Sequence, residues 1–399
     1  MVRTINSIER VKAAINFKGP DKVPVWKFGS GSDLYILANL PSVNWRPGHD
    51  DVEKGLFPHT GNDLVIKYGL WKWDKPEWAK NDKYKDWLNL PREEVDEFGT
   101  IWVRKGINTM GHPGRPSLQD YSKLDEYFEK YTPNFDEKSR YSYAIQMCNK
   151  KATDKYRMCS LGLGPFQIAS QIRGFEKILS DQYRKKNELK ELLEHLTNCF
   201  INLEKMWVKY GGNPDGFVLY DDLGEQRGPF FSNKIFKDFY KSVYKNLFET
   251  AHDLGCDFHL HCCGKIDPII PLLIEWGLDA LELDSPRMTG YHELNQYRGK
   301  IMIWACLNIQ SIYTLGTPSE CEREVWHMIR NLGTPLGGMG AYFYPQVDHI
   351  QVTQANIDAF SEGLAKYGNY ENLPDHWWTY PVVDDWKDNE VPPLPPKRN

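Results

Sequence analysis

The sequence has no apolar run of 18 residues, so we expect no membrane span. It has no excess of basic residues either, because 49 lysines and arginines are set against 54 acidic residues. A formal net charge of −5 argues against a nucleic-acid partner, which usually requires a basic face. The first residues, MVRTINSIERVKAAINF, carry charges throughout and are typical of an amphipathic helix rather than an export signal.

Cysteines are few and scattered: the chain has eight, and apart from the pair Cys262 and Cys263 they stand alone. This scatter excludes a disulfide framework and predicts a reducing, cytoplasmic location, where thiols stay free to bind a metal. Aromatic residues, by contrast, make up 14% of the chain, including 14 tryptophans. That content is consistent with an aromatic-lined pocket as well as with an ordinary core.

The order of apolar segments predicts an α/β fold. From residue 156 onward, strand-like and helix-like segments alternate at a spacing of roughly 30 to 45 residues, which indicates βαβ units and a parallel sheet. About eight such units, with no GxGxxG after the first strand, favour a single (β/α)8 TIM barrel over a doubly wound sheet. We expect the barrel over residues 1–370, with N-terminal helical and loop segments and an insertion around 70–150. A Pro- and Trp-rich extended tail would cover residues 371–399.

Several local signals place individual elements. Ser7 is a plausible N-cap for the first helix, and Thr353 for the last. Residues 23–29 read as the first strand and residues 64–69 as a second one, while residues 99–106 predict a hairpin inserted above the core. Inserted loops of this kind often carry substrate contacts.

The stretch FHLHCCGK, residues 258–265, predicts a metal site. In a strand, His259, His261 and Cys263 project to one face because side chains alternate with a period of two. Neutral imidazole and thiolate are favoured ligands of zinc. The alternative is an ordinary core, since cysteine is often buried and a core histidine can bond a backbone carbonyl. By alternation Cys262 faces away, into the core.

Two further strands end in reactive groups, which favours the metal interpretation because barrel active sites lie at the carboxyl ends of strands. One strand is followed by Asp221, Asp222 and Glu225, and another by Cys306. Of the two aspartates, we expect one to cap the turn that follows and the other to face the site. A catalytic zinc takes three protein ligands and leaves a fourth position open. The third ligand stays open: Cys306 matches best, and the oxygen alternatives are Asp222, Glu225 and Glu282.

Five motifs together resemble the uroporphyrinogen decarboxylase superfamily over residues 5–367. They are DKVPVW, YDDLGEQRGPFFS, HCCG, LDALELD and the T-x-x-N start of the last helix. The decarboxylases proper carry arginines after the first strand, whereas this chain has WKFGSGSD, which argues against a multi-carboxylate porphyrinogen. The other branch consists of zinc-dependent, cobalamin-linked methyltransferases, whose H-x-C motif matches His261-Cys262-Cys263. Coenzyme M methyltransferases of this branch have a second zinc cysteine after the last strand, and YPQVDHIQVTQAN holds none.

The resemblance therefore implies the methyltransferase component of an O-demethylase. Such an enzyme takes the methyl group of a methoxylated aromatic compound and passes it to the cobalamin of a corrinoid protein. Zinc on His261, Cys263 and Cys306 would act as a Lewis acid, with Asp222 or Glu225 donating a proton or positioning the substrate. The expected ring pocket consists of Trp26, Phe28 and Tyr220, any of which could instead be core. His259 is expected to contribute to substrate binding from a deeper position, behind the ligands.

Three alternatives stay open. The enzyme could pass a methyl group from a methyl-corrinoid protein to a thiol such as coenzyme M, or it could be a decarboxylase like its relatives. It could also be a non-catalytic barrel that binds a small aromatic ligand. The long aromatic tail is consistent with a homodimer, if it packs on a partner subunit.

Overall fold

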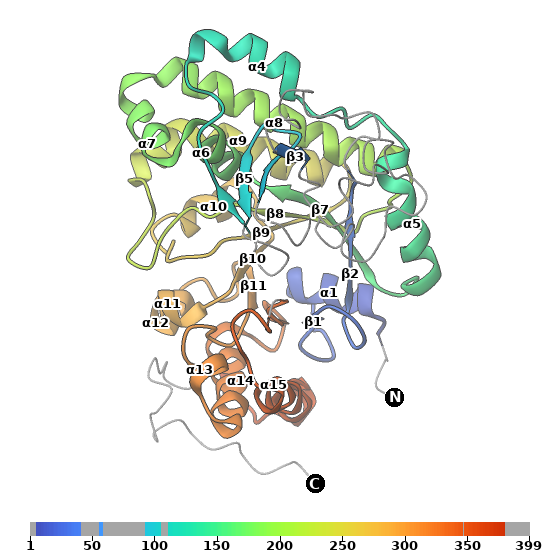
Figure 1. Ribbon diagram of the computed structural model, residues 1–399. Coiled ribbons are helices and arrows are strands. Elements are labelled where there is room, and N and C mark those ends of the chain that lie inside the picture. Colours follow the sequence, from blue (N-terminus) through green and yellow to red (C-terminus); the bar gives the residue numbers. More distant parts are fainter. Residues whose placement is uncertain (1–4, 41–55, 59–91, 105–110, 346, 380–399) are drawn as a thin grey trace.

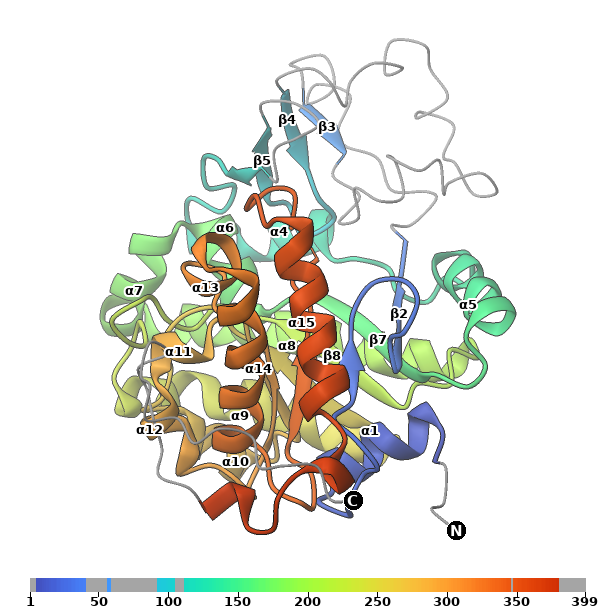
Figure 2. The same cartoon turned by 90° about the horizontal axis from the view of Figure 1, so that it is seen from below.

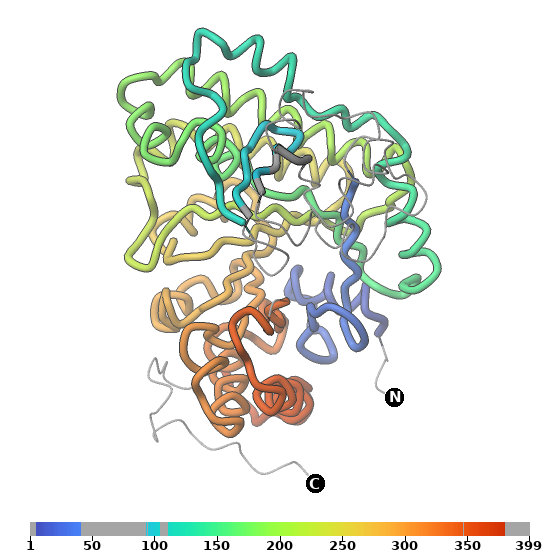
Figure 3. Tube along the Cα trace, viewed as in Figure 1, coloured from blue at the N-terminus to red at the C-terminus, as the bar shows by residue number. Residues whose placement is uncertain are grey.

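The structure is a computed structural model that describes residues 5–40, 56–58, 92–104, 111–345 and 347–379 of the chain. Eight parallel strands form one sheet in the order β1-β12-β11-β10-β9-β8-β7-β2, surrounded by helices (Figure 1). This nearly closed barrel confirms the predicted (β/α)8 fold. Figure 3 shows the first and last parts of the chain side by side, as the pairing of β1 with β12 requires.

The barrel strands are short and mostly buried, as expected of strands covered by helices. They are β1 (Val25–Trp26), β2 (Leu34–Ala38), β7 (Tyr156–Leu163), β8 (Gly216–Tyr220), β9 (Asp257–His261), β10 (Ala280–Leu283), β11 (Met302–Ala305) and β12 (Met339–Tyr342). Every residue of β10, β11 and β12 is buried. The residues just after these strands therefore emerge together at one end of the barrel.

The helices pack outside the sheet through apolar stripes, such as the leucines of α8, which are buried. They are α1 (Ser7–Ile15), α4 (Leu124–Tyr131), α5 (Ser139–Lys151), α6 (Pro165–Arg173), α7 (Phe175–Arg184), α8 (Lys186–Lys209), α9 (Asn233–Asp253), α10 (Ile270–Trp276), α11 (Pro286–Thr289), α12 (Tyr291–Asn295), α13 (Ile312–Leu315), α14 (Pro318–Leu332) and α15 (Gln354–Tyr367), with the 3-10 turns η5 (Tyr121–Lys123), η6 (Tyr370–Asn372) and η7 (Trp377–Thr379). No helix among the described residues is long and apolar enough to cross a membrane.

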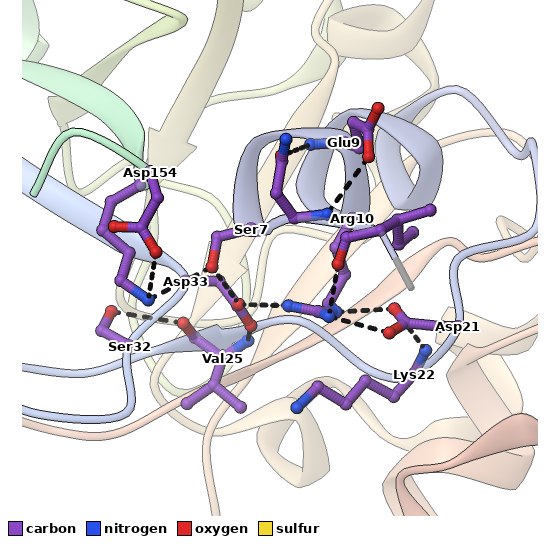
Figure 4. A network of polar contacts seen from close by, with 12 residues as sticks. Ser7, Glu9, Arg10, Asp21, Lys22, Val25, Ser32, Asp33 and Asp154 are labelled. Carbon is purple, nitrogen blue, oxygen red and sulfur yellow. Dashed lines mark hydrogen bonds and ion pairs between the residues drawn. The ribbon is translucent and has the colours of Figure 1, made fainter. Parts of the chain in front are cut away.

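The seam between β1 and β2 is bridged by a buried aspartate (Figure 4). The backbone N–H of Asp33 donates to the Val25 carbonyl at 2.7 Å, and its carboxylate accepts from the Val25 N–H at 2.8 Å. The same carboxylate accepts from the hydroxyl of Ser7 at 2.8 Å and from the guanidinium of Arg10 at 2.7 Å. This network ties α1 to the two strands that end the sheet order.

Ser7 is therefore not the N-cap of α1, contrary to the prediction. Asn6 takes that place, and its side chain forms a capping box with Glu9. The Ser7 hydroxyl is engaged by Asp33 instead. The predicted cap of the last helix is confirmed, because the Thr353 side chain accepts from the N–H of Asn356.

The second barrel strand is β2, which was not predicted. It follows the Gly- and Ser-rich turn after β1 directly, without the helix that separates strands elsewhere in the barrel. The strand expected at residues 64–69 lies outside the described residues. In the expected tail, Trp377 of η7 is buried and its ring lies 6.0 Å from that of Tyr370. Residues 380–399 lie outside the described part.

A second, four-stranded sheet contains the predicted hairpin. Its strands are β3 (Leu56–Pro58), β4 (Arg92–Val95), β5 (Ile101–Arg104) and β6 (His112–Pro113), in that order, and β5 pairs antiparallel with both neighbours β4 and β6. Figure 2 shows it at the end of the barrel where α13 and α15 begin, with α1 at the opposite end. The sheet is held to the helical layer by the Tyr127 hydroxyl, which donates to the Phe98 carbonyl at 2.7 Å.

Candidate metal centre

Three neighbouring strands place their last inward-facing residues at matching levels. The register pairs Tyr220 of β8 with His261 of β9, and His261 with Glu282 of β10. Because the side-chain period is two, Asp222, Cys263 and Asp284 stand one level higher, just beyond the strand ends. The two levels together form a polar cluster at the mouth of the barrel.

His261 is the centre of this cluster. Its Nδ1 contacts a carboxylate oxygen of the fully buried Glu282, and its Nε2 lies 3.2 Å from Cys263 Sγ and 3.8 Å from Asp222 Oδ1. Burial alone would lower the pKa of His261, but the adjacent Glu282 carboxylate outweighs it and raises the pKa to about 9. The imidazole is therefore oriented with Nδ1–H toward Glu282 and Nε2 toward the thiol.

The upper level is held together by hydrogen bonds. The backbone N–H of Cys263 donates to Asp222 at 2.9 Å, and the Cys263 thiol donates to Asp284 at 3.2 Å. The Gln167 amide donates to the other Asp222 oxygen at 2.8 Å. Burial and the neighbouring carboxylates raise the pKa of the Cys263 thiol. A cation bound beside this thiol would favour its thiolate form.

The donor set fits a divalent metal. Two groups have ligand atoms within 4.8 Å of one another: Asp222, His261 and Cys263, and His261, Glu282 and Asp284. Buried oxygens of Glu282 and Asp284, Oε1 and Oδ1, have no hydrogen-bond partner in the described part of the chain. Burial raises the pKa of Glu282 to about 7, as expected of clustered carboxylates. A bound cation would relieve this excess of negative charge.

The geometry suggests which atoms would hold the metal. Because Glu282 occupies Nδ1 of His261, Nε2 is the nitrogen available as a ligand, in the carboxylate–histidine arrangement typical of zinc sites. Cys263 Sγ is the sulfur ligand beside it. Asp222 and Asp284 lie close enough to provide the oxygen ligand. A nitrogen, sulfur and oxygen set of this kind suits zinc.

Two predicted residues are not brought into the cluster. Cys306 is buried, its thiol interacts with the backbone of Tyr344, and it belongs to neither group of candidate ligands. The side chain of Glu225 is exposed, while its backbone bonds Gly228 and Lys265 at 2.9 and 2.8 Å. Glu225 thus shapes the loop after β8 and holds the turn after Cys263 in place.

The two aspartates after β8 have separate roles, as predicted, but Asp221 does not cap the turn that follows it. Asp221 is fully buried and accepts from the backbone N–H groups of Phe166 and Gln167, at 3.1 and 2.8 Å, so it caps the start of α6. Burial raises the pKa of Asp221 to about 7. Asp222 faces the cluster. Cys262 is in the core, as expected, and its sulfur accepts from the Leu223 N–H.

His259 lies one level below the cluster, inside the barrel. Its Nδ1 accepts from the indole N–H of Trp304 at 3.0 Å, and its Nε2 lies 3.0 Å from the Tyr156 hydroxyl. Burial lowers the pKa of His259 to about 4. Both nitrogens are thus used by the protein, and this histidine is a neutral part of the core rather than a group beside the cluster.

The residues expected to form a ring pocket lie in different environments. Tyr220 flanks His261, with ring centroids 5.2 Å apart. Trp26 is almost fully buried and packs edge-on against Trp304 at 5.6 Å. Phe28, by contrast, is 55% exposed. Of the three, Tyr220 is the one in ring contact with a member of the cluster.

Sequence reasoning missed Asp284 and two tyrosines, Tyr342 and Tyr344. The signal for Asp284 was present, because it stands two residues after Glu282 in LDALELD and so shares its face. The same alternation applies to Tyr342 and Tyr344 in GAYFYP, at the end of the last strand.

A family profile described as "Uroporphyrinogen decarboxylase (URO-D)" matches residues 105–339, more than half of the chain. The chain belongs to this family. Among solved structures, this URO-D family protein is similar to a methyltransferase from Methanosarcina mazei, at 16% sequence identity and a TM-score of 0.60. That match covers 91% of this chain and 99% of the other, so the two share the fold over nearly their whole length. A comparison with curated proteins found no match.

Proposed function

We propose that this URO-D family protein is a methyltransferase that takes the methyl group of a methoxylated aromatic compound. The acceptor is the cobalamin of a partner corrinoid protein. The observation that carries this proposal is the cluster of His261, Cys263 and carboxylates at the barrel mouth, with the Tyr220 ring beside it. The name and the near-complete coverage of the Methanosarcina mazei structure support the reaction class.

In this proposal His261 Nε2 and Cys263 Sγ hold zinc, with a carboxylate from Asp222 or Asp284. When bound, the ion would supply a Lewis acid for the ether oxygen, whose departure as an aryloxide is otherwise slow. Glu282 keeps the proton of His261 on Nδ1. Asp222, fixed by Gln167 and partly exposed, orients the donor where Asp284 is the ligand.

The test combines metal analysis with methyl transfer. Purified protein is incubated with cob(I)alamin and a panel of methoxybenzenes, and methylcobalamin formation is followed by absorbance. We expect stoichiometric zinc and activity in the wild type, and loss of both in Cys263→Ala. Cys306→Ala is the matched control, since this buried thiol lies outside the candidate ligand groups and the variant should keep its zinc.

A fully active, zinc-free wild-type protein would contradict the proposal. Transfer from methylcobalamin to a thiol, without any demethylation of ethers, would reverse the assigned direction. Loss of zinc in Cys306→Ala and not in Cys263→Ala would refute the ligand assignment.

A further inference from the structure

Three tyrosines surround the polar cluster at the barrel mouth, one at the end of β8 and two at the end of β12. Tyr220 ends β8 with its ring inclined by 47° to that of His261. Tyr342 ends β12, is 4% exposed, and packs against Trp26 with ring centroids 4.8 Å apart. Each tyrosine thus occupies the inward-facing end of a barrel strand.

Tyr344 extends this row by one level. Phe343 points outward, because its ring stacks on Phe360 of α15 at 4.0 Å. Alternation therefore turns Tyr342 and Tyr344 to the inside of the barrel. The contact between the Tyr344 backbone and the Cys306 thiol fixes the position of this residue after the strand end.

We call these three residues, Tyr220, Tyr342 and Tyr344, the tyrosine wall. Their hydroxyls have no hydrogen-bond partner among the described residues, and none of them is among the fully buried unpaired polar atoms. A tyrosine hydroxyl is both donor and acceptor, so each can donate a hydrogen bond to an oxygen bound at the barrel mouth.

Acidic groups outnumber basic ones in the cluster. Asp222, Glu282 and Asp284 contribute three carboxylates and Cys263 a thiol, while His261 is the one member of the two ligand groups able to carry positive charge. The nearest lysine along the chain, Lys265, is held by Asp267 at 3.3 Å. A divalent cation held by neutral His261, a Cys263 thiolate and one carboxylate would be neutralised by its own ligands, which leaves the other two carboxylates uncompensated.

We propose that the site selects uncharged methoxyaromatic donors and rejects donors whose ring bears a carboxylate. The tyrosine wall binds the ring and donates hydrogen bonds to its oxygen substituents, and the largely buried carboxylates repel an anionic ring. This inference rests on the proposed function and names the substrate class for the same site.

The test compares two donors that differ in charge, 2-methoxyphenol and 2-methoxybenzoate, at pH 7. We expect kcat/KM to be at least about tenfold higher for the uncharged donor, a difference of about 1.4 kcal/mol. Calorimetric binding of each donor to the zinc-loaded protein, without any corrinoid, should show the same preference.

The role of the wall is tested by Tyr344→Phe, which keeps the ring and removes the hydroxyl. We expect about a tenfold rise in KM for 2-methoxyphenol with kcat and zinc content little changed, because the lost hydrogen bond contributes to binding. Tyr183→Phe, at a 68% exposed position on α7, is the control and should behave as wild type.

Equal kcat/KM values and equal affinities for the two donors would overturn the inference, even if methyl transfer is confirmed. If neither donor is demethylated while 2-methoxyphenol still binds at least tenfold more tightly, the proposed function fails and the charge preference stands. An unchanged KM in Tyr344→Phe would refute the claim that the tyrosine wall binds the donor through its hydroxyls.

Discussion

Replacing Glu282 with Gln tests how the cluster is organised. The carboxylate of Glu282 is fully buried and contacts His261 Nδ1, while its other oxygen has no partner in the described chain. Gln has nearly the same shape and still offers an oxygen to Nδ1–H, but it removes the negative charge. The variant therefore changes the strength of this hydrogen bond while leaving the packing of β10 in place.

The expected magnitude follows from the kind of hydrogen bond. A bond to a charged group contributes about 1.5 to 3 kcal/mol, against about 0.5 to 1.5 kcal/mol for a neutral pair. The loss of about 1 to 2 kcal/mol should weaken zinc binding by roughly 5- to 30-fold, in line with the effect of removing a carboxylate behind a ligating histidine. Competition with a chromophoric chelator at pH 7.5 measures the zinc dissociation constant directly.

Glu225→Gln is the control, because the same chemical change is made on an exposed side chain outside the candidate ligand groups. It should leave zinc affinity unchanged. Wild-type affinity in Glu282→Gln would refute the assignment of Nδ1 to Glu282 and Nε2 to the metal. A loss far beyond 100-fold would instead make Glu282 a direct ligand.

Three predictions concern stability. Asp33→Asn should lower the free energy of unfolding, measured in urea, by about 3 kcal/mol, because it removes the buried charge that pairs with Arg10. Asp154→Asn is the control: it changes an exposed ion pair and should alter this free energy by less than about 1 kcal/mol (Figure 4). His327 is buried, and neither of its ring nitrogens has a hydrogen-bond partner among the described residues; burial lowers its pKa to about 3. The unfolded chain takes up this proton below about pH 6.5, so stability falls as pH is lowered from there, and His327→Phe should reduce the loss between pH 7 and pH 5 by about 2 kcal/mol. An identical pH dependence in both proteins would refute this. Gly164→Ala should lower the melting temperature, because its methyl group would collide with the carboxylate that caps α6, while Gly228→Ala, where the added group meets open space, should not.

Much of the fold could be predicted from sequence because the regular part of the chain repeats one unit. From β7 onward each buried strand is followed by an amphipathic helix, so periodicity and order suffice. The N-terminal part breaks this rule. β1 and β2 are joined by a short turn without a helix, and their seam is completed by the Asp33 side chain. A hydrogen bond from a strand backbone to a side chain leaves no periodic pattern in the sequence, so it could not be predicted.

The candidate site was predictable only in part, because alternation identifies a face but not a partner. Cys306 follows a strand end just as Asp284 does, yet its thiol is engaged by the Tyr344 backbone. Glu225 follows the same strand as Asp222, but the loop has already turned its side chain to solvent. Loop direction depends on backbone contacts between distant segments, and these are not visible in a local pattern.

The contrast between His259 and His261 shows what decides function on one strand. Both face the barrel interior, two residues apart, and strand alternation by itself does not distinguish them. The register places Ala280 beside His259 and Glu282 beside His261. With indole and phenol partners, burial lowers the pKa of His259 to about 4, whereas the carboxylate raises that of His261 to about 9. The strands HLHCC and ALELD thus combine into the candidate metal centre only when β9 and β10 pair in this register. A shift by two residues would put a carboxylate beside His259 in the core and leave His261 without Glu282 at its Nδ1.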